Sequence, residues 1–292
     1  MNEKLQITAI VLTYNEENKI EDCLKSMKDL FEDIFIVDSY STDKTVDIAK
    51  KYTNHIFQHE FENYGKQRNW ALKNLPLKTE WVINIDADQR ISENLKQELQ
   101  QIFLDPSKIH CRGFLISRKT IFMDKWIKFG GHYPSYHAIL FKLKFGMCEE
   151  SRYDQHFTIT GMVKKIKGDL EDIVTDNLSS FIERHNKWAS FEATDQALGE
   201  DQISRNQGIR PNLFGNPMER KRFFKALYFK TPIFIRPISY FIFRYFVRLG
   251  FLDGPEGLIF HFLQCLWFRF LVDAKIYELK KNAKSISHRQ VK

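Results

Sequence analysis

The stretch WVINIDAD, residues 81–88, is an apolar run that ends in two carboxylates separated by one residue. A run of this kind predicts a buried strand, so Asp86 and Asp88 would stand at the rim of the sheet to which it belongs. Paired carboxylates at such a rim can hold a divalent cation together with a diphosphate. Because Asp-Ala-Asp is also ordinary turn chemistry after a strand, the metal interpretation depends on the rest of the chain.

The residues around this stretch alternate between strand-like and helix-like patterns with short breaks. Ile7–Leu12 is a near-continuous apolar run, suited to a strand buried on both faces. The other predicted elements are a helix capped by Asn15 with Ile20, Cys23, Leu24 and Met27 on one face, a strand at 35–37 ending at Asp38, a helix capped by Asp43, a strand at 55–57, a helix from near Gly65, and a helix from Ser92 to Phe103. This alternation implies an α/β fold with a mostly parallel, doubly wound sheet.

Polar residues follow the predicted strands at their carboxyl ends, where ligands bind in such sheets. They are Thr13, Tyr14, Asn15 and Glu16 after the first strand, Asp38 after the second, and Asp86 and Asp88 after the fourth. No Gly-x-Gly-x-x-Gly fingerprint and no Gly-rich loop ending in Lys-Ser/Thr follows the first strand, which argues against a dehydrogenase and a P-loop ATPase. A metal ion would therefore carry most of the charge of a bound diphosphate.

The composition indicates one main domain plus an appendage, because 292 residues with 43% hydrophobic content can bury a substantial interior. The net charge of +7 suits an anionic membrane or anionic acceptors, and no nucleic-acid module is visible. Because Met1–Gln6 leads straight into the first strand without a signal pattern, we expect a cytoplasmic active site. We also expect free thiols, since metal-ligand spacing is lacking among Cys23, Cys111, Cys148 and Cys265.

The composition shifts from about Pro211, where aromatic and aliphatic residues become dense and basic residues interrupt them. The longest apolar candidate, Gly257–Phe268, is shorter than the roughly 18 residues of a spanning helix and contains His261. Aromatic and basic residues at helical spacing predict an interfacial helix on an anionic membrane, and the alternative is a helical subdomain that covers the sheet. We divide the chain into a domain at 1–210 and a helical, membrane-associating region at 211–292, peripheral to the inner face of the cell membrane.

Four blocks of the sequence occur in a fixed order: Ile10–Glu17, Val37–Ser39 with Ser41–Thr45, Gly65–Ala71, and Asp86–Asp88. On these blocks the chain resembles the family 2 inverting glycosyltransferases, whose GT-A fold is a Rossmann-like mixed, mostly parallel sheet flanked by helices. More closely, it is similar to the branch that builds lipopolysaccharide core and related envelope glycans, on the blocks Gly130–Pro134, Tyr153–Phe157 and Gly250–Gly254. The resemblance covers most of the chain and implies that residues 1–210 bind a nucleotide-sugar.

The resemblance implies a role for each matching position. The segment Thr13, Tyr14, Asn15 and Glu16 would hold the nucleoside with Asp38, whose carboxylate would accept a hydrogen bond from the base. Arg68 would lie near the diphosphate or the sugar, and the alternative is a solvated cation at the start of a helix. Asp86 would face the sugar or ribose, and Asp88 would coordinate Mg²⁺ or Mn²⁺ bridging the phosphates.

An inverting transfer also needs a general base on the face of the sugar opposite the leaving group. Asp154 is our candidate, because it lies in the block that resembles the base-bearing region of the family, and His156 is the runner-up. The alternative is a loop whose charges pair with Arg152, and Glu149 and Glu150 are expected to be solvated.

One position departs from the family pattern, and several aromatic residues have open roles. Related sequences commonly read Arg-Leu-Phe where this chain has Ile139-Leu140-Phe141, which puts the identity of the acceptor in doubt. Trp126 and His132 fit either an acceptor-binding face or packing, whereas packing is favoured for His137.

Together these observations predict a metal-dependent inverting glycosyltransferase that uses Mg²⁺ or Mn²⁺. It would move a hexose from a nucleotide-sugar, preferably UDP-linked, to a saccharide acceptor of lipopolysaccharide core or a related cell-envelope glycan. One alternative is transfer to a polyprenyl phosphate. Another is a catalytically inactive, glycosyltransferase-like membrane scaffold, against which Asp38, Asp86 and Asp88 count.

Overall fold

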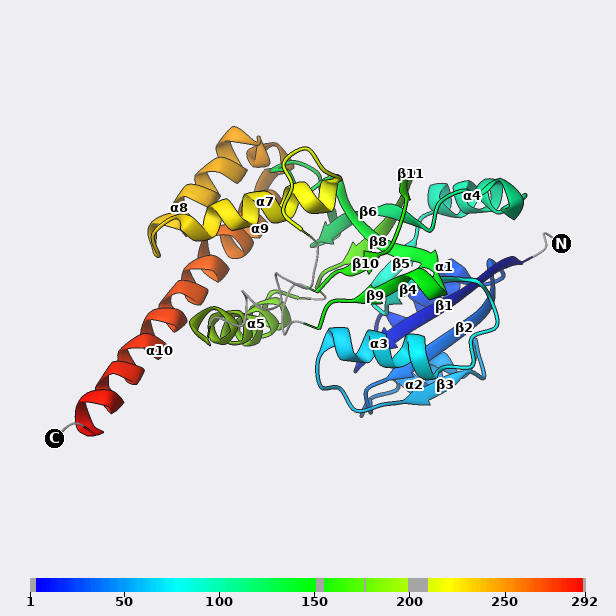
Figure 1. Ribbon diagram of the computed structural model, residues 1–292, viewed down its shortest axis with the longest axis horizontal. Coiled ribbons are helices and arrows are strands. Elements are labelled where there is room, and N and C mark those ends of the chain that lie inside the picture. The colour runs from blue at the N-terminus through cyan, green and yellow to red at the C-terminus, as the bar shows by residue number, and fades with distance from the viewer. Residues whose placement is uncertain (1–3, 151–154, 176, 199–209, 291–292) are drawn as a thin grey trace. The chain divides into compact units, whose positions relative to one another are not determined.

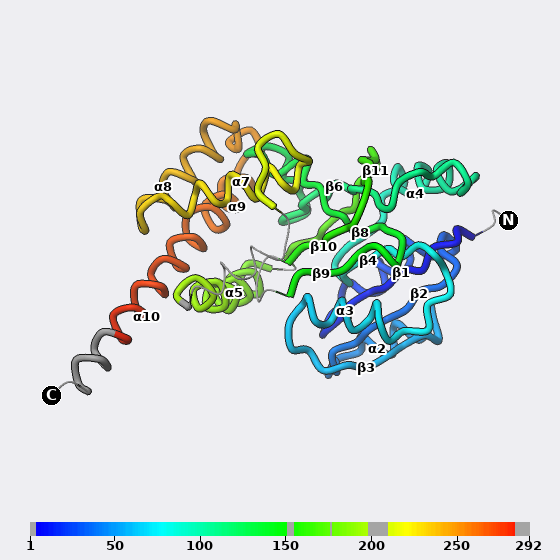
Figure 2. The backbone as a smooth tube through the Cα atoms, in the orientation of Figure 1, coloured from blue at the N-terminus to red at the C-terminus, as the bar shows by residue number. Residues whose placement is uncertain are grey.

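A computed structural model describes residues 4–150, 155–175, 177–198 and 210–290. The chain divides into two compact units. The first takes the residues up to 119 together with 134–150 and 155–173, and the second takes 120–133 and the described residues from 174 onward. Figure 1 and Figure 2 trace the chain from the blue N-terminal strands to the red C-terminal helix.

The first unit is built on a mixed sheet whose N-terminal strands are parallel. β1 (Leu5–Thr13) lies between β2 (Phe31–Asp38) and β4 (Trp81–Asp86), and β3 (Ile56–Gln58) pairs with β2. All of these pairings are parallel. Residues 7–12 and 81–85 are buried, which explains why both read as continuous apolar runs rather than as alternating patterns.

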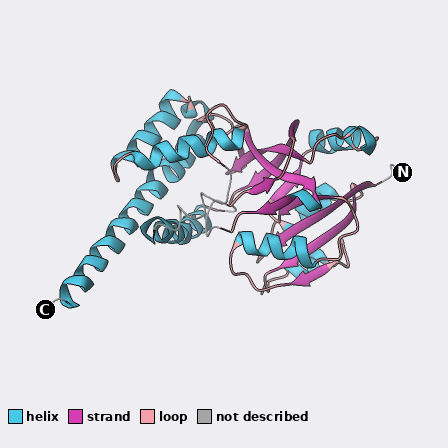
Figure 3. Ribbon diagram, viewed as in Figure 1, coloured by secondary structure: helices cyan, strands magenta, loops and turns pink. Residues whose placement is uncertain are grey.

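Antiparallel strands extend this sheet beyond β4. In order from β4 they are β8 (Ser135–Lys142), β6 (Gly113–Phe122), β11 (Val163–Ile173) and β5 (Gln89–Ile91), while β9 (Gly146–Cys148) and β10 (Phe157–Ile159) form a separate ribbon. In the second unit, β7 (Lys125–Ile127) pairs with β6 from Thr120 on. Figure 3 shows helices lying beside these strands, so the predicted fold class is confirmed. The sequence patterns had placed no strand between 104 and 173.

The helices of the first unit follow the predicted order. They are α1 (Ile20–Met27), α2 (Thr45–Ala49), α3 (Tyr64–Asn74) and α4 (Glu93–Ile102), with 3₁₀ turns at Pro106–Lys108 and Leu143–Phe145. The Ser92 cap is confirmed, because its side chain accepts a hydrogen bond from the backbone N–H of Leu95. The Asn15 cap is wrong: α1 begins only at Ile20, and Asn15 has a φ of 52°, in a turn region that asparagine tolerates.

The second unit is mostly helical. Its helices are α5 (Leu178–Leu198), α7 (Pro217–Lys230), α8 (Ile235–Ile242), α9 (Gly254–His261) and α10 (Phe268–Gln290), with π-helical segments at Phe243–Val247 and Phe262–Trp267 and a 3₁₀ turn at Gly250–Asp253. Ala189 and Ala193 of α5 pack in one cluster with Phe268, Val272 and Ile276 of α10. The helical unit therefore includes α5, which precedes the boundary placed at residue 210.

One helical run among the described residues, Gly250–Ala283, is long and apolar enough to cross a membrane by length and composition. Its mean hydropathy is 1.3, and 39% of the apolar window is buried within the protein. The sequence had limited the candidate to Gly257–Phe268, because polar interruptions hid the continuity of the helix. A core helix of a soluble protein can meet the same criteria, so the run is weak support for membrane association.

The stability of the second unit should fall in mild acid because of His185. Its ring stacks on Phe181 at 3.8 Å, and its Nε2 lies 2.8 Å from Oε1 of Gln264. Burial lowers the pKa of His185 from 6.5 to about 4, against the opposing effect of its hydrogen bonds. Between these values the unfolded chain binds a proton that the folded chain does not, so stability is full above pH 6.5 and falls as the pH approaches 4. The loss is up to about 1.4 kcal/mol per pH unit.

Urea unfolding measured from pH 7 to pH 4.5 checks this expectation. In His185→Gln the dependence should be weaker, whereas the same change at the exposed His110 should leave it as in the parent protein. Equal pH slopes in His185→Gln and the parent would contradict it.

Candidate active site

The polar strand ends meet at one edge of the parallel sheet, as predicted. Thr13 at the end of β1 is in register with Asp38 at the end of β2, and Leu12 is in register with Asp86 at the end of β4. Backbone hydrogen bonds continue past the strands, from Ser39 N–H to the carbonyl of Thr13 and from Ala87 N–H to the carbonyl of Leu12. The carboxyl ends of β1, β2 and β4 thus lie together at one edge of the sheet.

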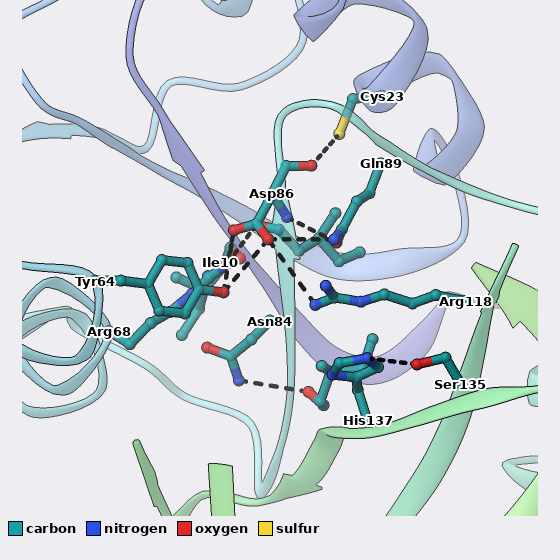
Figure 4. A network of polar contacts seen from close by, with 12 residues as sticks. Ile10, Cys23, Tyr64, Arg68, Asn84, Asp86, Gln89, Arg118, Ser135 and His137 are labelled. Atoms are coloured by element: carbon teal, nitrogen blue, oxygen red, sulfur yellow. Dashed lines mark hydrogen bonds and ion pairs between the residues drawn. The ribbon is translucent and has the colours of Figure 1, made fainter. Parts of the chain in front are cut away.

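Asp86 is the centre of a polar network at this edge (Figure 4). Its carboxylate lies 2.5 Å from a guanidinium nitrogen of Arg68 and accepts hydrogen bonds from the Tyr64 hydroxyl at 3.1 Å and the Gln89 amide at 3.2 Å. Arg118 approaches the second carboxylate oxygen to 4.0 Å. The side chain of Asp86 keeps 25% exposure, so it faces both the protein and the open edge.

Arg68 is fully buried, so the alternative of a solvated cation at a helix start is wrong. Besides Asp86, its guanidinium donates to the backbone carbonyls of Ile10 in β1 and Ile85 in β4. A buried arginine is tolerable only when its charge and its N–H groups are matched in this way. Arg68 therefore fixes Asp86 against two neighbouring strands, and direct contact with a diphosphate stays a prediction.

Several residues of the block Gly65–Ala71 make close contacts between α3 and the segment at 148–149. Asn69 donates to the carbonyl of Cys148 at 3.0 Å and accepts from its N–H at 2.9 Å, which fastens β9 to the helix. Gly65, one turn earlier, lies so close to the chain that a methyl group there would overlap the carbonyl oxygen of Glu149. Tyr64 and Arg68 contact Asp86, so α3 joins β4 to the segment that precedes the proposed base.

Gly65→Ala should destabilise the protein, although alanine is normally better than glycine inside a helix by about 1 kcal/mol. The added methyl group would push the backbone at Glu149 away from α3, and such overpacking typically costs about 1–3 kcal/mol. Urea unfolding measures the change. Lys66→Ala, at the exposed neighbouring position, is the matched control and should have little effect. A Gly65→Ala protein as stable as the parent would show that the contact with Glu149 is not tight.

The loop after β1 is braced by the loop after β2. The side chain of Asn15 accepts from Thr42 N–H at 2.8 Å, and Asn15 N–H donates to the Ser41 hydroxyl at 2.9 Å. Glu16 N–H donates to the Thr45 hydroxyl at 2.8 Å. The two blocks of the sequence therefore form one surface, from which the Tyr14 side chain projects with 57% exposure.

Asp38 is completely buried. Its carboxylate accepts from the Ser41 hydroxyl at 2.5 Å, from Ser41 N–H at 2.9 Å and from the Gln58 amide at 3.2 Å. These contacts make it an anchor for the loop at 39–41. A hydrogen bond to a nucleobase, which stays a prediction, would require one of these donors to move.

Sequence reasoning missed Arg118 and Asp172, which lie on β6 and β11. Burial alone would lower the pKa of the Arg118 guanidinium, yet the pKa is raised because nearby carboxylates favour the charged form. In order of effect these carboxylates belong to Asp172, Asp86 and Asp88. The available signal was an Arg-Lys pair inside the otherwise uncharged stretch Gly113–Phe122. No sequence signal pointed to Asp172, because only the antiparallel pairing of β11 with β5 places it opposite Gln89.

Asp88, the predicted metal ligand, lies in the half-buried turn between β4 and β5. Its backbone carbonyl accepts from Ile173 N–H at 3.0 Å, which ties the turn to β11. Cys23 lies beneath the same turn and contacts the carbonyl of Asp86 at 3.7 Å. Burial first, and then the charges of Asp88 and Asp86, raise the pKa of Cys23, which keeps it a thiol.

The proposed general base Asp154 and its neighbour Arg152 lie outside the described residues. The runner-up His156 is buried. Its backbone N–H donates to the Glu149 carboxylate at 3.1 Å, and its ring Nδ1 lies 3.8 Å from the same carboxylate. The Glu149 side chain is only 7% exposed, so the expectation that it is solvated is wrong. Glu150 is exposed, but its carboxylate accepts from Asn69 at 3.1 Å.

The remaining aromatic candidates have packing partners. In the first unit, the His137 ring lies parallel to that of His156, with ring centroids 5.7 Å apart, and Ile139 is buried in β8. In the second unit, Trp126 meets Tyr133 edge-on at 4.9 Å, and His132 meets Phe260 at 4.7 Å. An acceptor-binding role for Trp126 or His132 stays a prediction.

Comparison with known proteins identifies the kind of chain to which this site belongs. Residues 8–166 match the family model "Glycosyl transferase family 2". A protein of Rickettsia bellii named as an uncharacterized glycosyltransferase is 36% identical over 98 residues, which cover 34% of this chain and 33% of that protein. The lipopolysaccharide core biosynthesis glycosyltransferase LpsC of Rhizobium meliloti is 24% identical over 289 residues, covering 94% of this chain and 93% of LpsC. The crystal structure of S. aureus TarS 1-349 is similar with a TM-score of 0.41 and 19% identity, over 93% of this chain and 91% of that chain.

Proposed function

The chain belongs to glycosyl transferase family 2, and from this premise we propose that it is a metal-dependent inverting glycosyltransferase. It transfers a hexose from a nucleotide-sugar, in our proposal a UDP-sugar, to a saccharide acceptor of lipopolysaccharide core or a related cell-envelope glycan. The observation that supports binding of the donor is the pairing of β1 with β2 and β4, which brings the strand ends at Thr13, Asp38 and Asp86 to one edge of the sheet. The similarity to LpsC supports the proposed saccharide acceptor.

The carboxylates at this edge suit a hard divalent cation. Asp88 follows Asp86 in the adjoining turn, and Asp172 adds a carboxylate close enough to act on the same Arg118. Carboxylate oxygens are the donors that Mg²⁺ and Mn²⁺ prefer. Since the oxygens of Asp86 already accept from Arg68, Tyr64 and Gln89, we assign Asp88 as the leading ligand.

The protein residues and the cation share the work of the reaction. When bound, the cation neutralises negative charge on the departing diphosphate. Arg118, whose side chain is 20% exposed beside Asp86, pairs with a phosphate oxygen in our proposal. Arg68 acts through Asp86 and keeps that carboxylate directed toward the sugar or ribose.

A general base removes the proton of the acceptor hydroxyl as it attacks the anomeric carbon. We assign this role to Asp154, with His156 as the alternative. The Glu149 carboxylate, 3.8 Å from Nδ1 of His156, would stabilise a protonated imidazole in that alternative. Transfer from the opposite side of the ring then inverts the anomeric configuration.

Peripheral association with the cytoplasmic face of the membrane completes the proposal. The second unit exposes large apolar side chains over α8, the turns that follow it, and α9. They include Ile238, Ile242, Phe243, Phe246, Val247, Phe251, Leu252 and Leu258. Arg248 is exposed among them, and apolar side chains beside a cation fit an anionic lipid surface.

Two rival functions make different demands on the same residues. Transfer to a polyprenyl phosphate would use the same donor half but would need little deprotonation of the acceptor, so Asp154 would matter far less. An inactive membrane scaffold would bind partners or nucleotides without catalysing transfer. The one feature that favours it is Ile139, which stands where related sequences commonly have arginine. The buried network around Asp86 counts against it, because burying such charges is costly without a use.

Donor turnover by the purified full chain in detergent tests the proposal. UDP-, GDP- and ADP-sugars are offered with Mn²⁺ or Mg²⁺ to the parent protein, Asp88→Ala and Asp154→Ala. We expect one donor to be turned over, with Asp154→Ala slower by about 10²-fold or more on a saccharide acceptor, the usual contribution of a general base. A normal rate in Asp154→Ala would favour a phosphate acceptor. No turnover and no metal-dependent nucleotide binding would reject the enzyme.

A further inference from the structure

A separate group of side chains in the second unit has the composition of a metal site. It consists of His132, in the loop after β7, His261 at the end of α9, and Cys265 in the π-helical segment that follows. One ring nitrogen of each histidine and the sulfur of Cys265 all lie within 4.8 Å of one another. Nδ1 of His261 is 3.9 Å from the sulfur, and both residues are completely buried.

The His261 ring is held in place by close backbone on two sides. A methyl group on Gly130 would overlap Cε1 of this ring, and one on Gly250 would come within 2.6 Å of its Nε2. Gly130 also has a φ of 66°, a conformation that favours glycine. Both glycines are therefore required for His261 to lie where it does, and the ring has little freedom to turn away from Cys265.

The loop that carries His132 is fastened to the segment just before α9. The Asp253 carboxylate accepts from Lys128 N–H at 3.1 Å and Phe129 N–H at 2.9 Å, and Gly130 N–H donates to the carbonyl of Arg248 at 2.9 Å. These contacts set the position of His132 relative to His261. The centroids of the two rings are 5.2 Å apart. Backbone contacts thus hold His132 close to His261, and the 3.9 Å contact between Nδ1 of His261 and the Cys265 sulfur joins the other two members.

Two polar atoms of this group lack hydrogen-bond partners among the described residues. Nε2 of His132 and Nε2 of His261 are buried, and neither has a hydrogen-bond partner within the part of the chain that the structure describes. Buried polar atoms are nearly always hydrogen-bonded, so each exception calls for an explanation. Imidazole nitrogen and thiolate sulfur form the donor set that Zn²⁺ prefers, unlike the oxygen donors around Asp88.

We propose that His132, His261 and Cys265 bind a single divalent cation with affinity for nitrogen and sulfur, for which Zn²⁺ is the best match. Zinc bonds of about 2.0–2.1 Å to nitrogen and about 2.3 Å to sulfur place tetrahedral ligands roughly 3.3–3.7 Å apart. The ligand atoms lie up to 4.8 Å apart, which exceeds these separations by up to about 1.5 Å, so binding would draw His132 and Cys265 toward the fixed His261 ring. The cation would tie the loop after β7 to the helical segment that begins at α9.

The surroundings are compatible with such a cation. With Nδ1 of His261 as the ligand atom, its Nε2 lies 4.0 Å from the Asp253 carboxylate, which is longer than the hydrogen bond that zinc-bound histidines usually donate to a carboxylate. The positive charges that act on members of the group are those of Arg244, Lys221 and Arg269, and Arg244 acts on all three members. The Cys265 thiolate and Asp253 would supply the opposing negative charges. The site does not depend on the proposed glycosyl transfer.

Cobalt substitution tests the site with a signal that the hard oxygen site cannot give. The full chain in detergent is stripped with a chelator and titrated with Co²⁺ in excess Mg²⁺. We expect a thiolate-to-cobalt charge-transfer band that saturates at about one equivalent per chain and disappears when Zn²⁺ is added. Absence of the band in protein that circular dichroism shows to be folded would overturn the proposal.

Matched variants assign the band to these side chains. Cys265→Ser should remove it, whereas Cys111→Ser, at a buried cysteine of the first unit, should keep it. His132→Gln, on the loop, should keep the thiolate but weaken cobalt binding by at least about tenfold. A band that persists in Cys265→Ser, or an unchanged affinity in folded His132→Gln, would also overturn the proposal.

Discussion

Replacing Asp88 by alanine is expected to abolish both metal-dependent nucleotide binding and sugar transfer. A catalytic cation contributes several kcal/mol to the stabilisation of charge in the transition state, so transfer should fall by about 10³-fold or more. In the parent protein, a nucleoside diphosphate at about a hundred times its Kd, with Mn²⁺ present, should increase the free energy of unfolding by about 2.7 kcal/mol and raise Tm by several degrees. Asp88→Ala should show no such rise.

Asp47→Ala is the matched control for this experiment. Asp47 is on the surface of α2, with a side chain 77% exposed and paired with Lys50, so its loss should change neither the Tm shift nor transfer. A full Mn²⁺-dependent shift in Asp88→Ala would mean that other carboxylates, such as Asp172, hold the cation without it. Asp172→Asn would then be the next variant to measure.

Replacing Arg68 by methionine should give the largest loss of stability among the site variants. The change keeps an unbranched apolar side chain but removes the guanidinium, which leaves Asp86 without its buried cation and the carbonyls of Ile10 and Ile85 without a donor. Removing one partner of a buried ion pair costs about 3–5 kcal/mol. The lower end applies here, because Asp86 is 25% exposed and keeps its contacts with Tyr64 and Gln89.

Urea unfolding of Arg68→Met and of Arg90→Met separates this effect from a general loss of charge. Arg90 pairs with Asp22 where both side chains are partly exposed, and such pairs contribute about 1 kcal/mol or less. Adding Asp86→Asn to Arg68→Met should recover part of the stability, because it removes the unpaired charge, but not transfer. If Arg68→Met costs no more than Arg90→Met, the buried pair does not hold the sheet edge together.

The sequence identified the strand ends correctly because their signal is local. Residues 7–12 and 81–85 are buried on both faces, so nearly every residue is apolar and the polar residues that follow stand out. Parallel strands joined by helices must then bring those ends to the same edge. The antiparallel strands β6, β8 and β11 gave a weaker pattern, because they mix buried residues with half-exposed ones.

The sequence by itself determined the order of strands and helices in the first unit and the family to which the chain belongs. It also selected Asp86 and Asp88 by their residue type at a strand end, and Arg68 through the family resemblance. Only the tertiary structure decided what these side chains contact: that Arg68 is buried against Asp86, that Asp38 anchors a loop, and that Arg118 and Asp172 come from β6 and β11. It also gathered His132, His261 and Cys265. The physical reason is that burial and pairing depend on contacts between residues far apart in the chain, which spacing along a single segment does not specify.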